Sequence, residues 1–114
     1  MSENMSEMLK GVLGGMVLEI IEKEEVYGYE IVKRLQDLGF EDIAEGTVYA
    51  ILTRLEHSHM VDVTRKPSAL GPPRKFYDLN VRGKKELHEF WARWETLKQR
   101  IDSLKSESIT TASN

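Results

Sequence analysis

Apolar side chains recur at helical spacing in three stretches of the first half of the chain. Residues 8–23 carry a broad apolar stripe, which predicts a first helix. A second helix is predicted over residues 28–38, and Gly39 follows it where a glycine commonly ends a helix. A third is predicted over residues 45–57. The short connection between the second and third helices is typical of a helix-turn-helix.

The second and third helices each have one face predicted to be buried, because their apolar residues are spaced three and four apart. The second helix buries Ile31, Leu35 and Leu38, with Val32 beside them. The third helix buries Val48, Ile51, Leu52 and Leu55.

The apolar period changes from helical to alternating after residue 60. Val61, Val63 and Arg65 alternate with Asp62 and Thr64, which predicts a strand. Lys75, Tyr77 and Leu79 alternate with Phe76 and Asp78, which predicts a second strand. The stretch "KPSALGPPRKFY", residues 66–77, joins them and contains all three prolines of the chain. These features predict a β-hairpin, called the wing below, with the prolines near its tip.

The resulting fold class is mainly α with a two-stranded β-wing. Residues 1–80 are predicted to form a winged helix-turn-helix domain. Residues 81–105 are predicted to form a single C-terminal dimerisation helix. The polar residues 106–114 are predicted to be a disordered tail.

The final helix carries apolar residues at alternating spacings of three and four, as in the a and d positions of a heptad. They are Leu87, Phe90, Trp94, Leu97, Ile101 and Leu104. Packing on its own domain is one interpretation of this stripe. We favour a homodimer interface, because a domain of three helices and one hairpin has little room to bury so many large side chains.

Three glycines in the first predicted helix and one tryptophan in the last leave two questions open. Gly11, Gly14 and Gly15 indicate close approach of another backbone, either within the domain or from a partner helix. Trp91 falls beside the heptad stripe. It either packs against the first helix or lines a small-molecule pocket between two subunits.

Net charge is concentrated by segment. The chain has 114 residues and a net charge of -3. Residues 44–85 nevertheless carry 8 basic and 4 acidic side chains, net +4. This middle segment could attract nucleic acid although the whole chain is acidic. The chain contains no cysteine and no apolar run long enough to cross a membrane, so we expect a cytoplasmic protein.

Catalytic and metal-binding patterns are absent from the sequence. His57 and His59 are two residues apart and would point in different directions on a helix, so they do not form a metal pair. No phosphate-binding glycine loop, nucleophile elbow or paired-carboxylate signature occurs. We therefore expect no enzymatic activity, no metal and no cofactor.

The side of the third helix opposite its buried face carries small and hydrogen-bonding residues. They are Gly46, Ala50, Thr53 and His57, with Thr47, Tyr49 and Arg54 on the flanks. Such a face suits entry into a DNA major groove. Lys66, Arg74 and Lys75 are expected to cluster at the tip of the wing, beside Arg65, and to contact phosphates.

Three motifs together resemble the PadR family of bacterial transcriptional regulators. They are "YGYEIVKRL" at residues 27–35, "EGTVYAILTRLE" at residues 45–56 and "GPPRKFYDLNVRGKKEL" at residues 71–87. The resemblance extends from about residue 9 to residue 104. The short C-terminal helix is similar to that of the small subfamily that ends in a single dimerisation helix.

The resemblance implies a homodimeric repressor that binds a palindromic operator in double-stranded DNA and is often relieved by a small aromatic effector. It implies that Thr47, Tyr49 and Arg54 read DNA, and that Tyr29 and Lys33 contact the DNA backbone. It assigns phosphate contacts to Lys66, Arg74 and Lys75. It also implies that Trp91 faces its twin across a central pore where an effector binds.

The sequence departs from the family pattern at three places. Ala44 replaces the usual helix-capping residue before Gly-Thr. His59-Met60-Val61 replaces the usual Gly-Leu-Ile before the first strand. Pro72 stands where relatives carry an arginine, which removes one cation from the wing.

Two functions of other classes remain open from the sequence. One is a winged-helix module that binds protein rather than DNA. The other is a small-molecule sensor whose dimer pore is its main site.

Overall fold

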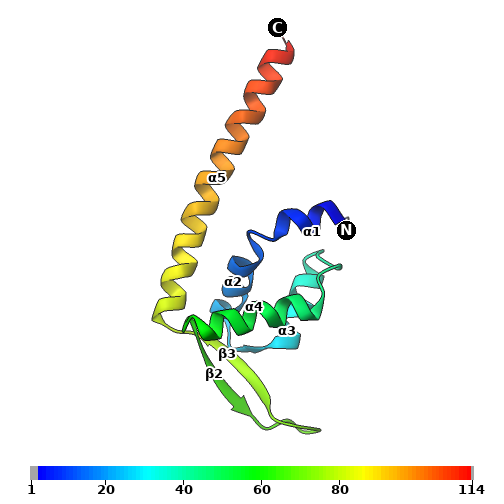
Figure 1. Cartoon of the computed structure of the whole chain (residues 1–114), viewed down its shortest axis with the longest axis vertical. Helices are drawn as coiled ribbons and strands as arrows, with labels where there is room; N and C mark the ends of the chain where they lie inside the picture. Colours follow the sequence, from blue (N-terminus) through cyan, green and yellow to red (C-terminus); the bar gives the residue numbers. More distant parts are fainter. Residues whose placement is uncertain (1–2, 114) are drawn as a thin grey trace.

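The computed structural model describes residues 3–113 of the chain. Its elements are α1 (Glu3–Leu9), α2 (Leu13–Lys23), β1 (Val26–Tyr27), α3 (Gly28–Asp37), α4 (Glu45–His57), β2 (Val61–Lys66), β3 (Arg74–Leu79) and α5 (Val81–Ser113). Helices α2, α3 and α4 pack with the small sheet into one body. The wing and α5 extend from this body in opposite directions (Figure 1).

The first helix is interrupted, contrary to the prediction of one helix over residues 8–23. Helix α1 ends at Leu9 and α2 begins at Leu13, with a turn around Gly11. Leu9 and Leu13 are both buried, whereas Met8 of the predicted stripe is exposed. The apolar period runs through the break, so it could not reveal the change of direction that brings Leu9 and Leu13 to the same core.

Helix α3 ends as the sequence predicts, but one residue of its predicted buried face is exposed. Gly39 has a φ of +102°, in the left-handed region that glycine favours. The N–H of Phe40 donates to the Leu35 carbonyl and the N–H of Gly39 to the Gln36 carbonyl, a Schellman motif. Leu38 is the C-cap residue and 55% exposed, because the chain turns away from the core there.

Helix α4 has the predicted bounds and the predicted buried face: Val48, Ile51, Leu52 and Leu55 are all buried. Its C-terminal end repeats the Schellman pattern, with the N–H of Met60 donating to the Leu55 carbonyl at 3.0 Å. The left-handed position is occupied by His59, at a φ of 58°, rather than by a glycine.

The wing is a hairpin within a three-stranded sheet, ordered β1-β3-β2 and antiparallel throughout. The sequence predicted β2 and β3 but not β1, which is only two residues long and depends on pairing with β3. In the register, Lys66 lies opposite Arg74 and Arg65 opposite Lys75. Because side chains alternate along a strand, these two pairs point to opposite faces of the wing.

Helix α5 is anchored to the body only by its first turns. Asn80 caps it: its side-chain oxygen accepts from the Gly83 N–H at 2.9 Å, and its amide donates to the His59 carbonyl at 2.8 Å. Leu87 is buried in the core. Phe90 packs so closely against Gly15 of α2 that a side chain at Gly15 would collide with the Phe90 ring.

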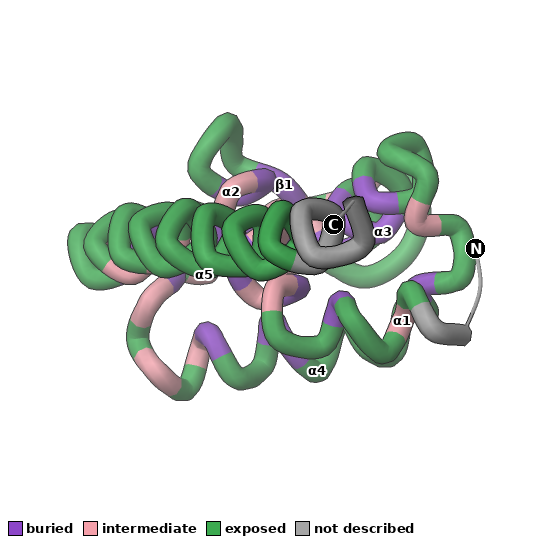
Figure 2. Tube along the Cα trace, turned by 90° about the horizontal axis from the view of Figure 1, so that it is seen from above, coloured by how far each residue is buried: buried purple, intermediate pink, exposed green. Residues whose placement is uncertain are grey.

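Farther along, α5 is exposed on nearly all sides (Figure 2), and it extends well away from the body (Figure 1). It runs to Ser113, so the predicted helix end near residue 105 and the disordered tail are corrected. No glycine or proline follows Gly83 to break the helix. Asn114 lies outside the described residues.

Among residues 3–113, no helix is both long and apolar enough to cross a membrane.

Candidate nucleic-acid interface

A groove of about 670 Å³ lies between the start of α3, one side of α4 and the base of the wing. It is lined by Tyr27, Gly28, Tyr29, Tyr49, Thr53, Arg74, Lys75 and Tyr77. The structure thus brings together four residues predicted to bind DNA: Tyr29, Tyr49, Arg74 and Lys75.

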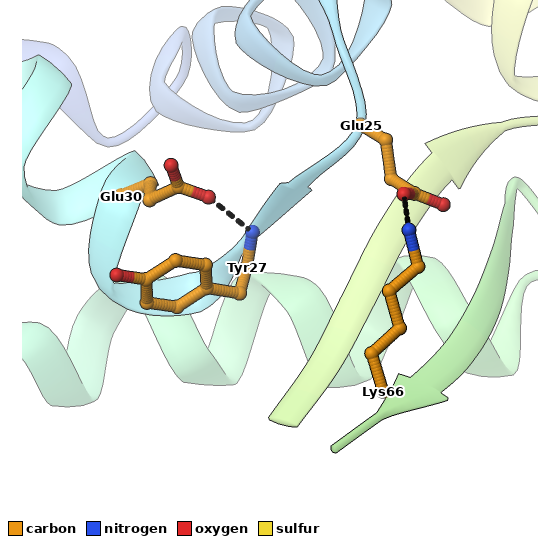
Figure 3. Close-up of polar contacts among 4 residues, drawn as sticks. All are labelled: Glu25, Tyr27, Glu30 and Lys66. Atoms are coloured by element: carbon orange, nitrogen blue, oxygen red, sulfur yellow. Dashed lines mark hydrogen bonds and ion pairs between the residues drawn. The ribbon is translucent and has the colours of Figure 1, made fainter. Parts of the chain in front are cut away.

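The junction of β1 and α3 fixes one wall of this groove. The backbone N–H of Tyr27 donates to the Glu30 carboxylate at 3.0 Å, which holds the first turn of α3 against β1 (Figure 3). The next residue is Gly28, and a side chain there would collide with the Tyr49 ring. Glycine at this position therefore allows Tyr49 of α4 to lie directly against the start of α3.

The wing supplies the positive charge of the groove. The Arg74 guanidinium lies 4.6 Å from the centre of the Tyr27 ring. The Lys75 ammonium nitrogen lies 3.4 Å from a Glu56 oxygen. Two cations and no carboxylate line the groove itself. Both cations remain partly open to solvent, so they can exchange their present contacts for an anion.

Tyr77 forms the inner end of the groove and stays neutral. Burial is the largest cause that raises the pKa of its hydroxyl, and the carboxylate of Glu56 adds to the shift. Tyr77 therefore keeps its proton at neutral pH and presents a hydroxyl rather than a negative charge. A neutral hydroxyl at this point preserves the positive character of the groove.

Lys66 does not line this groove. It forms an ion pair with Glu25, which precedes β1, and its ammonium group lies 4.8 Å from the centre of the Phe76 ring (Figure 3). Lys66 points to the same face of the wing as Arg74, so strand alternation does not separate it from the groove; its contacts with Glu25 and the Phe76 ring hold its ammonium group elsewhere. The predicted cluster of three wing cations is therefore divided.

Thr47 and Arg54 lie on the other flank of α4. They line a separate cavity of about 600 Å³ with residues of α1 and α2. A guanidinium nitrogen of Arg54 would be 3.0 Å from a Cβ placed at Gly14. Lys33 lies in a third hollow, formed with the end of α2. The residues predicted to bind DNA therefore line three separate hollows rather than one groove.

Four groove residues were absent from the predicted set: Tyr27, Gly28, Thr53 and Tyr77. Thr53 stands on the exposed face of α4, which the helical period already indicated. Tyr27 opens the "YGYEIVKRL" motif, and Tyr77 alternates with Phe76 in the wing. Their shared location depends on how β3 packs beside α4, for which the sequence carries no local signal.

Gly14 and Gly15 admit groups from within the chain, Arg54 and Phe90 respectively, which favours the alternative of close approach within the domain at these two glycines. Trp91 lies beside them on α5. Its indole N–H donates to the Glu19 carboxylate at 2.8 Å, and its ring meets that of Phe90 edge-on at 5.0 Å. The opposite side of the indole remains exposed.

The heptad stripe of α5 divides into two parts. Leu87 and Phe90 pack within the chain. The remaining four, Trp94, Leu97, Ile101 and Leu104, are between 39% and 64% exposed. No group of metal-ligating side chains occurs in the part of the chain that the structure describes.

A compact set of three helices with an antiparallel wing, and a tyrosine-lined cationic groove beside the third of them, defines a winged-helix protein. The chain belongs to the transcriptional regulator PadR-like family, whose sequence profile matches residues 17–89. This confirms the resemblance carried by the three motifs.

Solved structures agree with this assignment. A PadR-like transcriptional regulator from Bacillus cereus is 41% identical, with a TM-score of 0.76 over 86% of this chain and 95% of that one. A Streptococcus transcriptional regulator is 40% identical, with a TM-score of 0.78 over 86% and 96%. Bacillus subtilis PadR, solved in complex with operator DNA, is 27% identical, with a TM-score of 0.65 over 70% and 47%.

Proposed function

We propose that this PadR-family regulator is a homodimeric repressor that binds a palindromic operator. The observation that carries the proposal is the groove in which Tyr29, Tyr49, Arg74 and Lys75 meet beside the exposed face of α4. Bacillus subtilis PadR, a structural relative, has been solved with operator DNA.

In this proposal α4 enters the major groove. Its exposed side carries Gly46, Ala50 and Thr53, which are small enough to let the helix backbone approach base edges. Tyr49 lies beside Arg74 and Lys75 in the cationic groove of the protein. In this arrangement Arg74 and Lys75 bind the phosphates next to the DNA major groove. Thr47 and Arg54 approach the duplex from the opposite flank of α4, and Lys33 from α3. Lys66 joins them once a phosphate replaces Glu25.

The dimer is formed through the exposed part of the α5 stripe. Trp94, Leu97, Ile101 and Leu104 lie along one side of the helix beyond the body, where they stay 39% to 64% exposed among the residues that the structure describes. An apolar stripe of this length is stabilised by pairing with a second copy. Two recognition helices in a symmetric dimer would contact half-sites about 34 Å apart, which requires a palindrome.

A small aromatic effector would act at Trp91. One edge of the indole is fixed by Glu19, while its exposed side is available for stacking. In a dimer joined along α5, two such rings would face a common space between the subunits. A molecule held there would change the angle between the two DNA-binding bodies and so release the operator.

Binding to selected DNA tests this proposal. Wild-type protein is used to select duplexes from a randomised pool, and affinity is then measured by fluorescence anisotropy between 50 and about 200 mM salt. Lys75→Ala should weaken binding and reduce the slope of log affinity against log salt by about 1 for each wing. Lys98→Ala, on exposed α5, is the matched control and should leave the slope unchanged. No retained duplex, or an equal slope for Lys75→Ala and wild type, would contradict the proposal.

A further inference from the structure

The tip of the wing carries no charge. It consists of Pro67, Ser68, Ala69, Leu70, Gly71, Pro72 and Pro73. Leu70 is 91% exposed, more than any other large apolar residue that the structure describes. It contributes nothing to the core, and a leucine held this far into solvent has no role in stabilising the fold.

The tip holds Leu70 in a defined position. The Ser68 hydroxyl lies 3.1 Å from the Leu70 carbonyl oxygen, 3.3 Å from that of Gly71 and 3.1 Å from that of Pro72. Gly71 has a φ of +103°, which turns the chain sharply after Leu70. The prolines restrict the backbone on both sides. Leu70 therefore needs little further ordering when it meets a ligand.

The cations nearest to the tip are drawn back toward the body. Lys66 and Arg74 lie opposite each other at the last paired position before the tip. Lys66 rests on Phe76 and is paired with Glu25, while Arg74 rests on Tyr27. The uncharged tip lies beyond the paired position of Lys66 and Arg74, and Figure 1 shows this loop farther from the body than the paired strands.

We propose that Leu70 enters the minor groove of DNA as an apolar wedge, next to the major-groove segment that α4 contacts. This inference rests on the proposed function. Arg74 and Lys75 belong both to the wing and to the groove beside α4, so a duplex in that groove continues past the wing tip. Arg74 and Lys66 then contact the phosphates that border the minor groove, and Leu70 lies between them.

The chemistry of the tip fits a duplex better than a protein surface. Leucine and proline are among the side chains that proteins insert between base steps from the minor groove. A protein partner would need a contiguous apolar patch. Leu70 is instead the one large aliphatic side chain of the tip, flanked by the small residues Ala69 and Gly71, and the other apolar side chains of the tip are those of Ala69 and the three prolines.

A wedge of this kind reads the deformability of DNA rather than its hydrogen-bonding pattern. Pyrimidine–purine steps such as TA and CA open easily, whereas A-tracts are stiff. Leu70 would therefore favour operators with a flexible step where the wing lies. This is a specificity contribution that the phosphate contacts of Arg74 and Lys75 cannot supply, because phosphates carry no sequence information.

The test uses full-length protein and the duplex selected by the wild type. Hydroxyl-radical footprinting locates the minor-groove position that the wing protects, and anisotropy gives affinities at several salt concentrations. Leu70→Ala should lose that protection and bind about tenfold more weakly, with an unchanged salt slope. Leu70→Met should retain binding. Leu38→Ala, at the exposed C-cap leucine that follows α3, is the matched control and should equal the wild type.

A second arm replaces the flexible step at the protected position with an A-tract. Wild-type affinity should fall, whereas that of Leu70→Ala should change little. If Leu70→Ala binds both duplexes as the wild type does while Lys75→Ala is impaired, the wedge is overturned and the proposed function stands. A protein-binding tip would give the same result. If wild-type protein retains no duplex, the experiment contradicts both the Leu70 wedge and the proposed function.

Discussion

At the scale of single residues, a residue other than glycine occupies the left-handed position at the end of α4. His59 has a φ of 58°, in a region that glycine occupies without steric conflict but other residues occupy at a cost of about 1–2 kcal/mol. The conformation is held by the Schellman bonds of α4 and by Asn80, which donates to the His59 carbonyl at 2.8 Å. All of these contacts use the backbone of His59, so its side chain is not needed for them.

His59→Gly should therefore stabilise the protein, by about 0.5–1 kcal/mol. The substitution removes the steric strain and keeps every backbone hydrogen bond. The matched control is His57→Gly, two residues earlier and inside α4, which should destabilise by a similar amount because glycine is a poor helix former. Urea denaturation of both variants measures the two shifts. Shifts of the same sign would show that the left-handed position carries no strain.

At the scale of elements, the joint between β3 and α5 determines where the long helix points. Gly83 lies in the first turn of α5, and a side chain there would collide with the Met60 carbonyl oxygen. Asn80 closes the same joint from the other side, by capping α5 and bonding to His59. The direction of α5 is thus set by close backbone contact rather than by its apolar stripe.

Gly83→Ala tests that joint, because helix propensity and the collision with the Met60 carbonyl predict stability changes of opposite sign. Helix propensity alone would stabilise α5 by up to about 1 kcal/mol. Collision with a backbone carbonyl, which cannot move aside as a side chain can, should outweigh this and destabilise by about 2 kcal/mol. Gly46→Ala in α4 is the matched control, since nothing lies within 4 Å of a Cβ at that position. Thermal denaturation should show Gly83→Ala below wild type and Gly46→Ala at or above it.

The elements also show what the sequence could predict. The bounds of α4 follow from local information, the spacing of Val48 to Leu55, and they are confirmed. Strand β1 was missed because two residues form a strand only through their pairing with β3. Similarly, the Glu25–Lys66 pair joins residues 41 positions apart, and no local pattern marks it.

The candidate site was predicted in its composition but not in its arrangement. Tyr49 and Arg54 are five positions apart, which places them about 140° apart around a helix. Helical geometry could therefore have separated Arg54 from Tyr49, as the structure does. The meeting of Tyr49 with Arg74 depends on the packing of the wing beside α4, which only the tertiary structure provides.

At the scale of the whole molecule, α5 and the wing project in opposite directions from one small body (Figure 1). The wing base carries the cationic groove, and α5 carries an exposed apolar stripe. A duplex at one end and a second copy at the other could bind at the same time without competing for surface. A change in the pairing of α5 would then reach the groove through the Asn80–Gly83 joint.

Leu97→Glu should convert the proposed dimer into a monomer. Leu97 is 49% exposed in the isolated chain, so the substitution leaves the body intact. In a dimer it would bury one carboxylate from each subunit near the other, and we expect the dissociation constant to rise at least about a hundredfold. Gln99→Glu, on the far side of α5, adds the same charge away from the stripe and should remain dimeric. Sedimentation velocity over a range of protein concentrations distinguishes the two variants.

If wild type and Leu97→Glu sediment alike as dimers, the subunits pair through a different surface. If the wild type is itself a monomer at every concentration, the palindromic mode of binding loses its basis, because a single α4 would then have to recognise the operator alone.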